Sequence, residues 1–273
     1  MSVRKHVFPA GVDVPPAVEV RNPAGSVTVE AVEGLAELRV EVAALDDVAE
    51  RLLDQVAVDL FEGPPTRLRV TVPDRWMLRT PRFAVSIGTP PGTAVRVTAG
   101  SADTRLRGSL GHVALTSASG RSDVELCTEL QLRTASGDAR IGTVNGRATV
   151  GAASADVRVH AVDGALEVRT ASGDVSVGEA AGTLSLRTAS GDVTVDRMAA
   201  GRVRMTTVSG DATVSVTPGL RVRLDLSSVS GRLESELMDH ASPGGDESAE
   251  LSLEIRSVSG DVRIRRVAPA AAH

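Results

Sequence analysis

A short tag, Ser-Gly-Asp, recurs along the chain, and its spacing restricts the possible folds more than any other feature. Together with degenerate copies, the middle residue of the tag falls at positions 102, 120, 137, 155, 173, 191 and 210, in steps of 17 to 19 residues. A period this regular predicts a repeat architecture, in which each unit of about 18 residues makes the same structure. The strict copies of the tag are Ser136–Asp138, Ser172–Asp174, Ser190–Asp192, Ser209–Asp211 and Ser259–Asp261.

One unit shows what the period contains. Leu166 and Val168 alternate with polar residues before the tag at Ser172–Asp174, and Val175 and Val177 alternate with polar residues after it. Alternation with a period of two on both sides of a Gly-centred bend is typical of two short β-strands. The apolar spacing of three and four residues that a helix needs is missing.

Two strand pairings fit this pattern: a chain of antiparallel hairpins, or a solenoid in which equivalent strands of successive coils stack in parallel about 4.8 Å apart. The solenoid places Leu166 against Leu184 and Val175 against Val193, so that each position meets a near-copy of itself. Hairpins would not require one fixed repeat length. We therefore expect an all-β fold, a right-handed parallel β-solenoid with coils of about 18 residues, the hand following the general rule for parallel β connections.

The tag itself is predicted to be the corner of each coil. Glycine supplies an unusual backbone angle there without a clash from Cβ. Only 1% of the residues are aromatic, which indicates a narrow interior filled by small aliphatic side chains. The residues just before Ser-Gly are expected at the tightest point of that interior; they are Ala135, Ala171, Ala189, Val208, Val229 and Val258. The predicted structural turn residues are Gly120, Gly137, Asp138, Asp156, Gly173, Asp174, Gly191, Asp192, Gly210, Asp211, Gly231, Gly260 and Asp261.

Three segments carry a resemblance to a known family: "LRTASGDVTV" at residues 186–195, "VRNPAGSVTV" at Val20–Val29 and "IRSVSGDVRI" at Ile255–Ile264. With these segments the chain resembles the bacterial putative-adhesin family of β-strand-repeat proteins, and the resemblance covers nearly its whole length. The resemblance implies a right-handed β-helix. It implies adhesion by label only and supplies no catalytic residues.

The remaining sequence suggests one elongated unit with three parts. Residues 1–95 form an irregular β-rich part, continuous with the solenoid, with a short capping helix near 46–55 that begins at a capping box, Asp47-x-x-Glu50. Residues 96–267 form the solenoid, interrupted by a polar loop at 239–250, where the tag spacing grows to 29 residues; 268–273 are a tail. The early strands are expected near Val18–Val29, Leu38–Val42, Val56–Phe61, Leu68–Val72 and Phe83–Ile87.

Stacked tags would place their aspartates in a row, which has two interpretations. Each Asp could cap its own corner by accepting backbone N–H hydrogen bonds. Alternatively the row could bind cations, but Ca²⁺-binding β-rolls carry an Asp-bearing turn about every nine residues, twice as often as here. We favour capping and predict no metal and no other cofactor. Arginines five residues upstream are expected to offset the repulsion between carboxylates; they are Arg133, Arg169, Arg187 and Arg256.

No catalytic or cofactor-binding residue is predicted, so the chain is expected not to be an enzyme. The histidines share neither a repeat position nor a metal-ligand spacing. Cys127 is interpreted as a small core residue, not a nucleophile. A sugar-binding or carbohydrate-active β-helix stays open as an alternative, although the aromatic platforms that usually hold sugars are missing. The histidines are His6, His112, His160, His240 and His273.

The expected partner is another protein or a second copy of the chain. A net charge of −5 with almost no aromatic residues argues against nucleic acid. No apolar stretch is long enough for membrane insertion, and no small-molecule substrate is indicated. Trp76 is interpreted as a buried cap residue, with an exposed partner anchor as the alternative. Val262–Val267 is expected to be the C-terminal edge of the solenoid, guarded by arginines or docking a partner.

The single cysteine and the absence of a signal-peptide pattern at the first residues predict a cytoplasmic protein. Its function is predicted to be that of a non-enzymatic structural or interaction protein, adhesin-like, that presents a repetitive β-solenoid surface.

Overall fold

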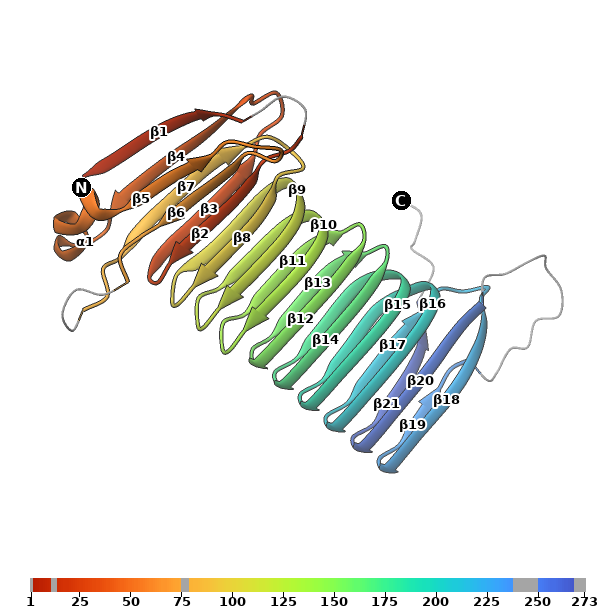
Figure 1. Ribbon diagram of the computed structural model, residues 1–273. Helices are drawn as coiled ribbons and strands as arrows, with labels where there is room; N and C mark the ends of the chain where they lie inside the picture. The colour runs from red at the N-terminus through yellow and green to blue at the C-terminus, as the bar shows by residue number, and fades with distance from the viewer. Residues whose placement is uncertain (1, 11–13, 75–78, 238–249, 268–273) are drawn as a thin grey trace, which may run out of the picture. The chain divides into compact units, whose positions relative to one another are not determined.

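The computed structural model describes residues 2–10, 14–74, 79–237 and 250–267 (Figure 1). The chain forms two compact units, Met1–Gly142 and Thr143–His273, which we call the first and the second unit. The boundary predicted near residue 95 divides irregular from repeated sequence, whereas the boundary at residue 142 divides two compact units. The first of these boundaries stays a prediction. Trp76, most of the predicted loop at 239–250 and the tail at 268–273 lie outside the described residues.

The described residues are almost entirely β-strand, as the alternation of apolar and polar residues predicts. The one α-helix in this part of the chain, α1 (Asp47–Leu52), continues into a short 3₁₀ helix, Leu53–Gln55. No helix in the described residues has the length and apolar character needed to cross a membrane. The first unit contains β1 (Val3–Pro9), β2 (Ala17–Asn22), β3 (Gly25–Ala31), β4 (Glu37–Ala44), β5 (Ala57–Phe61), β6 (Arg67–Thr71), β7 (Phe83–Thr89), β8 (Ala94–Ala99), β9 (Asp103–Ser117), β10 (Ser122–Thr134) and most of β11 (Ala139–Val144).

The second unit continues with strands that fall on both sides of each Ser-Gly-Asp corner. They are β12 (Arg147–Ser154), β13 (Val157–Val162), β14 (Ala165–Ser172), β15 (Val175–Ser190), β16 (Val193–Ser209), β17 (Ala212–Val216), β18 (Arg221–Ser230), β19 (Leu233–Ser235), β20 (Glu250–Ser259) and β21 (Val262–Arg266).

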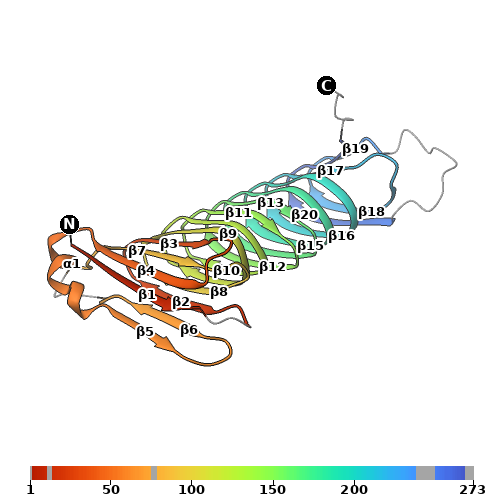
Figure 2. The same ribbon diagram turned by 90° about the horizontal axis from the view of Figure 1, so that it is seen from above.

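The first unit joins parallel and antiparallel pairing. Strand β2 pairs in parallel with β8, and β3 with β9. Strand β9 also pairs in parallel with β8 and with β10. On their other sides β2 and β3 pair in parallel with β6 and β7. The direction then reverses, because β5 is antiparallel to β6, β4 to β7 and β1 to β4. Figure 2 shows β5 and β6 as a hairpin beside β1 and β4.

The predicted helix is present, with a different cap. Asp46, not Asp47, is the N-cap residue: it has an extended backbone, and its Oδ1 accepts a hydrogen bond from the Ala49 N–H at 2.7 Å. Its Oδ2 also accepts from the Arg82 N–H at 3.2 Å and so ties the helix start to the segment before β7. The N-cap is thus one residue earlier than predicted, and Ala49, three residues after it, cannot complete a capping box. The outer strands β1 and β5, more than the helix, complete the sheets at this end of the first unit.

All described strand pairs of the second unit are parallel, and the repeat fixes their register. Leu166 lies opposite Leu184 and Val175 opposite Val193, as the sequence predicts. Equal residues therefore stack on one another from repeat to repeat. An all-hairpin arrangement is excluded for these strands. At these positions of β14, β15 and β16 the apolar side chain is almost completely buried; Leu184 and Leu186 are both 0% exposed.

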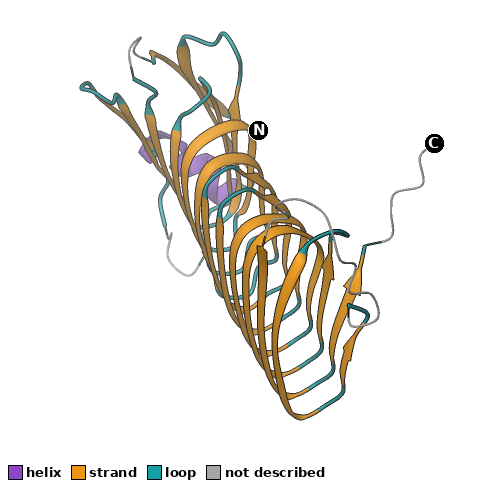
Figure 3. Ribbon diagram, turned by 90° about the vertical axis from the view of Figure 1, so that its right-hand side faces the viewer, coloured by secondary structure: helices purple, strands orange, loops and turns teal. Residues whose placement is uncertain are grey.

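The repeats of the second unit do not lie in sequence order at its C-terminal end. Strands β20 and β21 pair with β16 and β17 on one side and with β18 and β19 on the other. The last described repeat, residues 250–266, therefore lies between the repeat that ends with β17 and residues 221–235 (Figure 1). Figure 3 looks onto this end of the second unit. The expectation that Val262–Val267 forms the edge is wrong: β21 is paired on both sides, and the outer strands here are β18 and β19.

The residues that precede Ser-Gly do not fill the interior. Ala135, Ala171 and Ala189 are exposed, and Val229 is 82% exposed. The alternation of inward and outward side chains continues up to the corner. The residue that precedes Ser-Gly therefore points outward, and the residue before that one points inward. The inward residues are Thr134, Thr170, Thr188, Thr207 and Ser257, all buried. At two of these positions the hydroxyl satisfies a corner carbonyl: Thr188 Oγ1 donates to Ser190 O at 3.1 Å, and Thr170 Oγ1 to Ser172 O at 3.0 Å.

Candidate functional site

The glycines of the tags stack directly on one another at the corners of the second unit. Gly173, Gly191, Gly210 and Gly260 have φ between +119° and +144°, a region that residues with a side chain rarely adopt. A Cβ added at Gly191 would also collide with the backbone carbonyl of Gly173. The corner therefore needs glycine for its backbone angle and for the close approach of the neighbouring repeat.

The tag aspartates form a ladder of hydrogen bonds between repeats. Asp174 Oδ1 accepts from the backbone N–H of Asp192 at 2.9 Å, and Asp192 Oδ1 accepts from that of Asp211 at 2.8 Å. The ladder continues from Asp211 Oδ1 to the N–H of Asp261 at 2.9 Å. Each carboxylate thus satisfies a corner N–H of the next repeat. The sequence had suggested that each Asp caps its own corner; the N–H that it binds belongs to its neighbour.

Arginines lie beside some of these carboxylates, though not those expected. Arg263 donates to Asp211 Oδ2 at 2.9 Å and to Asp261 Oδ2 at 2.7 Å. It follows Asp261 by two residues, and residues two apart in a strand lie on the same face. The expected arginines, five residues upstream, lie across the corner; Arg169 and Arg256 pair instead with glutamates.

The hydrogen bonds of the ladder lower the pKa of one carboxyl group. The N–H of Asp261, then the guanidinium of Arg263, hold the pKa of Asp211 below its ordinary value of 3.8. The same contacts raise the pKa of Arg263, chiefly through its hydrogen bond to Asp211. In the described residues no group of three or more His, Cys, Asp or Glu side chains is placed to hold a metal ion. The geometry of the ladder is that of a structural device.

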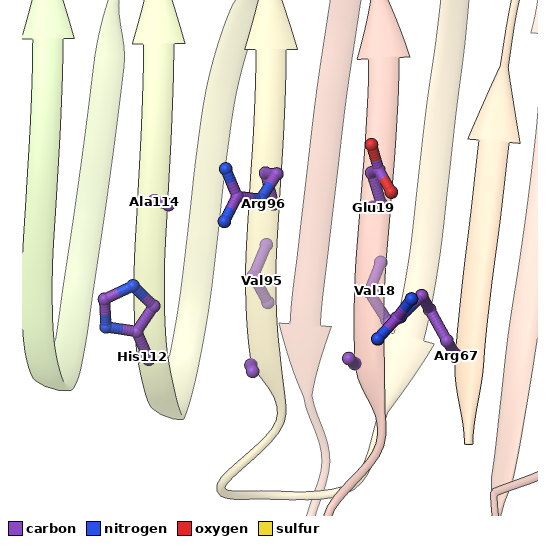
Figure 4. A pocket seen from close by; sticks show the side chains of 9 residues that line it. Val18, Glu19, Arg67, Val95, Arg96, His112 and Ala114 are labelled. Atoms are coloured by element: carbon purple, nitrogen blue, oxygen red, sulfur yellow. The ribbon is translucent and has the colours of Figure 1, made fainter. Parts of the chain in front are cut away.

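The described surface has a groove on the outer face of the first unit, where β2, β6, β8 and β9 run side by side (Figure 4). Its volume is about 340 Å³. Small side chains hollow it out, because Ala17 lies opposite Ala94 and Ala114 opposite Arg96 in neighbouring strands. A smaller hollow of about 100 Å³ shares Arg96 and Ala114 and extends to Arg133 on β10. We call the two together the outer groove.

The charges of the outer groove are unevenly matched. The one carboxylate in its lining, Glu19, is paired with Arg69 at 3.1 Å, and His112 is paired at Nδ1 with Glu129, which lies outside the lining, at 3.3 Å. Three arginines of the groove, by contrast, have no ion-pair partner within the described part of the chain; they are Arg67, Arg96 and Arg133. The groove therefore offers guanidinium groups to an anionic ligand.

The histidines that the structure describes are dispersed: His6 is on β1, His112 on β9, in the outer groove, and His160 on β13. His240 and His273 lie outside the described residues. Cys127 is fully buried, and desolvation raises the pKa of its thiol to about 11, as expected of a core residue. The outer groove was missed from sequence because it lies on irregular strands. The aligned alanines, outward-facing on neighbouring strands, were the available signal.

Three solved structures are among those similar to the chain. A putative adhesin from Parabacteroides merdae is 11% identical with a TM-score of 0.37; the match covers 96% of this chain and 95% of that one. A putative adhesin from Bacteroides fragilis is 11% identical with a TM-score of 0.39, covering 96% and 97%. A putative lipid binding protein from Parabacteroides distasonis is 11% identical with a TM-score of 0.40, covering 98% and 95%.

A comparison with curated proteins gave no match. A comparison with protein families gave one that spans most of the chain, including the irregular strands from β5 onward and nearly all of the repeats. Residues 55–265 match the family described as Toastrack DUF4097. The chain belongs to the Toastrack DUF4097 family.

Proposed function

We propose that the protein is a non-enzymatic, adhesin-like interaction protein whose outer groove binds an extended acidic segment of a partner protein. In this proposal the repeats form a right-handed parallel β-solenoid with coils of about 18 residues, the hand that parallel β connections generally take. The solenoid is the rigid support, and the groove is where specificity resides.

The observation that carries the proposal is the excess of unpaired arginines in the outer groove. Arg96 and Arg133 project from strands of one sheet, separated by β9, and Arg67 lies on the far side of β2. Neighbouring strands of a sheet lie about 4.8 Å apart. The three guanidiniums therefore follow a line across the strands, and a segment with several carboxylates, laid across the same strands, could meet them in turn.

An acidic polysaccharide is the second candidate, because its carboxylates would meet the same guanidiniums. The lining favours a peptide, since it contains no Trp, Tyr or Phe ring on which a sugar could stack. A peptide can also use the backbone and apolar parts of the groove around Ala17, Ala94 and Ala114.

The test measures binding of a fluorescein-labelled, glutamate-rich peptide by fluorescence anisotropy at two salt concentrations. We expect Arg96→Ser combined with Arg133→Ser to weaken binding about tenfold or more. The control, Arg187→Ser, removes an exposed arginine of the second unit and should leave binding unchanged. Equal loss in the control would show unspecific charge attraction and contradict the proposal. An oligogalacturonate that binds more tightly than the peptide would favour the second candidate.

Two further expectations need separate experiments. The lack of enzymatic activity is tested by incubation with polysaccharide substrates followed by a reducing-end assay, in which released ends would contradict it. The cytoplasmic location is tested by fractionation of cells with an antibody against the protein. Recovery in the envelope or medium would overturn that expectation without affecting the groove.

A further inference from the structure

The outer strand β18 has a partner on one side only. In the described part of the chain it pairs with β20, and no described strand covers its other edge. Its free edge therefore carries backbone N–H and C=O groups that can pair with a further strand. Such edges are frequent sites of β-strand addition.

The inward side of β18 is only half covered. Val222, Leu224 and Leu226 point inward in register with Leu251, Leu253 and Ile255 of β20. The three residues of β20 are 0% exposed, whereas those of β18 are intermediate. The apolar interior of the second unit thus continues up to β18, beyond which no described residue covers it.

The outward side of β18 carries charges that lack partners. Arg223 and Asp225 are exposed, and neither has an ion pair within the described residues. Asp225 lies directly opposite Glu254 of β20, a like charge, and Glu254 is itself held by Arg204 at 2.7 Å. Like charges opposite one another in a sheet are unfavourable. A cation on the free side of β18 would relieve this pair.

The corner next to β18 shows that the parallel stack ends here. At the tag position of this repeat the residue after Gly231 is Arg232, where the other repeats of the second unit carry Asp. The N–H of Arg232 is bound by Asp261 Oδ1 at 2.9 Å, but Arg232 has no carboxylate to offer to a following repeat. A parallel strand added to β18 would bring a corner N–H without an acceptor. An antiparallel strand would not place a corner beside Arg232, so it would not leave such an N–H without an acceptor.

We propose that β18 pairs antiparallel with β18 of a second copy, about a two-fold axis at Leu224. This register places Arg223 of each copy opposite Asp225 of the other. On the inward side it places Leu224 opposite its own equivalent and Val222 opposite Leu226. Both outward charges gain a partner, and both inward rows gain a cover.

Neighbouring registers are less favourable. An axis at Arg223 would oppose two arginines, and an axis at Asp225 would oppose two aspartates. A shift by one residue would place apolar side chains opposite charged ones, because the side chains of a strand alternate between its faces. The sequence of β18 thus favours one antiparallel register with itself.

Sedimentation velocity of the full chain over a range of concentrations tests the proposal. We expect a dimer whose dissociation constant rises about tenfold or more in Asp225→Arg, since four arginines then face one another in two pairs. The double variant Arg223→Asp with Asp225→Arg should restore the wild-type constant, because it exchanges the charges of each pair. The control Glu167→Arg makes a similar charge change on β14, which is paired on both sides, and should have no effect.

A mixing experiment tests the two-fold register directly. Wild type and the double variant, distinguished by an isotope label, are mixed and examined by native mass spectrometry. Each should pair only with itself, because a mixed dimer opposes Arg with Arg and Asp with Asp. A statistical mixture of dimers, or a double variant as weak as Asp225→Arg, would overturn the register.

The edge could instead be covered by residues of the same chain that lie outside the described ones. In that case the wild type would be a monomer at all concentrations, and replacing residues 238–249 by a short Gly/Ser linker would produce a dimer. Either result would overturn the proposal. Dimerisation that persists unchanged in this linker variant supports it.

Discussion

The outer strands of the first unit and those of the second unit end their sheets in different ways. In the first unit the strand direction reverses: β1 and β5 are antiparallel additions whose inward residues are half buried, and the strands beneath them are buried, with Val40 on β4 only 2% exposed. In the second unit the last strand, β18, is parallel to its neighbour, and its inward residues stay half exposed. The first unit also contains the helix α1, which contributes the buried residues Ala49 and Leu52.

The difference shows what it takes to end a stack of parallel strands. A reversal of direction interrupts the repeat and allows irregular elements, such as α1, to close the interior. A parallel last strand keeps the interior open and leaves a template for one more strand. The two ends therefore differ in strand direction: irregular antiparallel strands end the sheets of the first unit, whereas the second unit ends in a strand that still carries the parallel repeat pattern.

The largest expected effect is a difference in unfolding free energy between a charge placed on a fully buried strand and one placed on the half-buried strand β18. Val40→Asp buries an unpaired charge and should cost several kcal/mol of unfolding free energy, whereas Leu224→Asp should cost about 1 kcal/mol at concentrations where the chain is monomeric. Chemical denaturation measures both. Cys127, buried in the first unit, provides a second readout, because Val40→Asp should speed its alkylation. Equal costs at the two positions would refute the distinction.

The second effect concerns the stacked glycines. Gly191→Ala should cost roughly 3 kcal/mol, since it combines an unfavourable backbone angle with a collision against Gly173 O. Gly219→Ala has only the angle, φ +89° with open space around it, and should cost roughly 1–2 kcal/mol. Gly231→Ala lies on the outer repeat, which can shift away, and should also cost less than Gly191→Ala. Thermal unfolding of the three variants gives this order, and a reversed order would contradict a rigid stack with a free end.

A smaller effect tests how the inserted repeat is held against β17. Because the folded pKa of Asp211 lies below 3.8, its contribution to stability is present above that pH and is lost as the pH falls through the lower folded value. Asp211→Asn should thus be less stable than wild type near neutral pH, and the difference should shrink below about pH 4. Urea denaturation across this pH range measures it. Asp196→Asn, an exposed change without a hydrogen-bond partner in the described residues, is the control.

Calcium should have the smallest effect. Each tag carboxylate already accepts a backbone N–H through one oxygen, so a row of cations would have to compete with the ladder. We expect the melting temperature in millimolar Ca²⁺ to equal that in chelator. Uptake of several calcium ions per chain with micromolar affinity would mean that the ladder is a metal site.

The sequence predicts the parallel register of the second unit because identical positions, such as Leu166 and Leu184, prefer to stack on one another. It predicts five early segments of strand, which the structure confirms as strand; the first of them, Val18–Val29, is divided into β2 and β3, the others are β4 to β7, and β1 is missed. Strand β1 lies on the outside, and its inward residues are only half buried, so that its alternation carries little apolar signal.

The likeness between repeats, which makes the register predictable, makes the spatial order of the last repeats unpredictable. Strands β18 and β20 have nearly the same pattern, and either fits against β16. The difference lies in Arg232, which lacks the carboxylate that an inner repeat needs, and in the step of 29 residues to Gly260. The outer groove depends on pairings between irregular strands, which no repeat reveals.

The place of residues 250–266 between two earlier segments bears on how the chain is made. A ribosome releases residues 221–235 before residues 250–266, yet β18 has its partner, β20, only in the later segment. During synthesis β18 and β19 either stay unpaired until β20 and β21 have been made, or pair first with β16 and β17 and are then displaced. Proteins generally begin to fold from the N-terminus while they are being made. Here the docking of residues 250–266 is an insertion between earlier segments, and β18 and β19 gain their partners only after residue 266 has been translated.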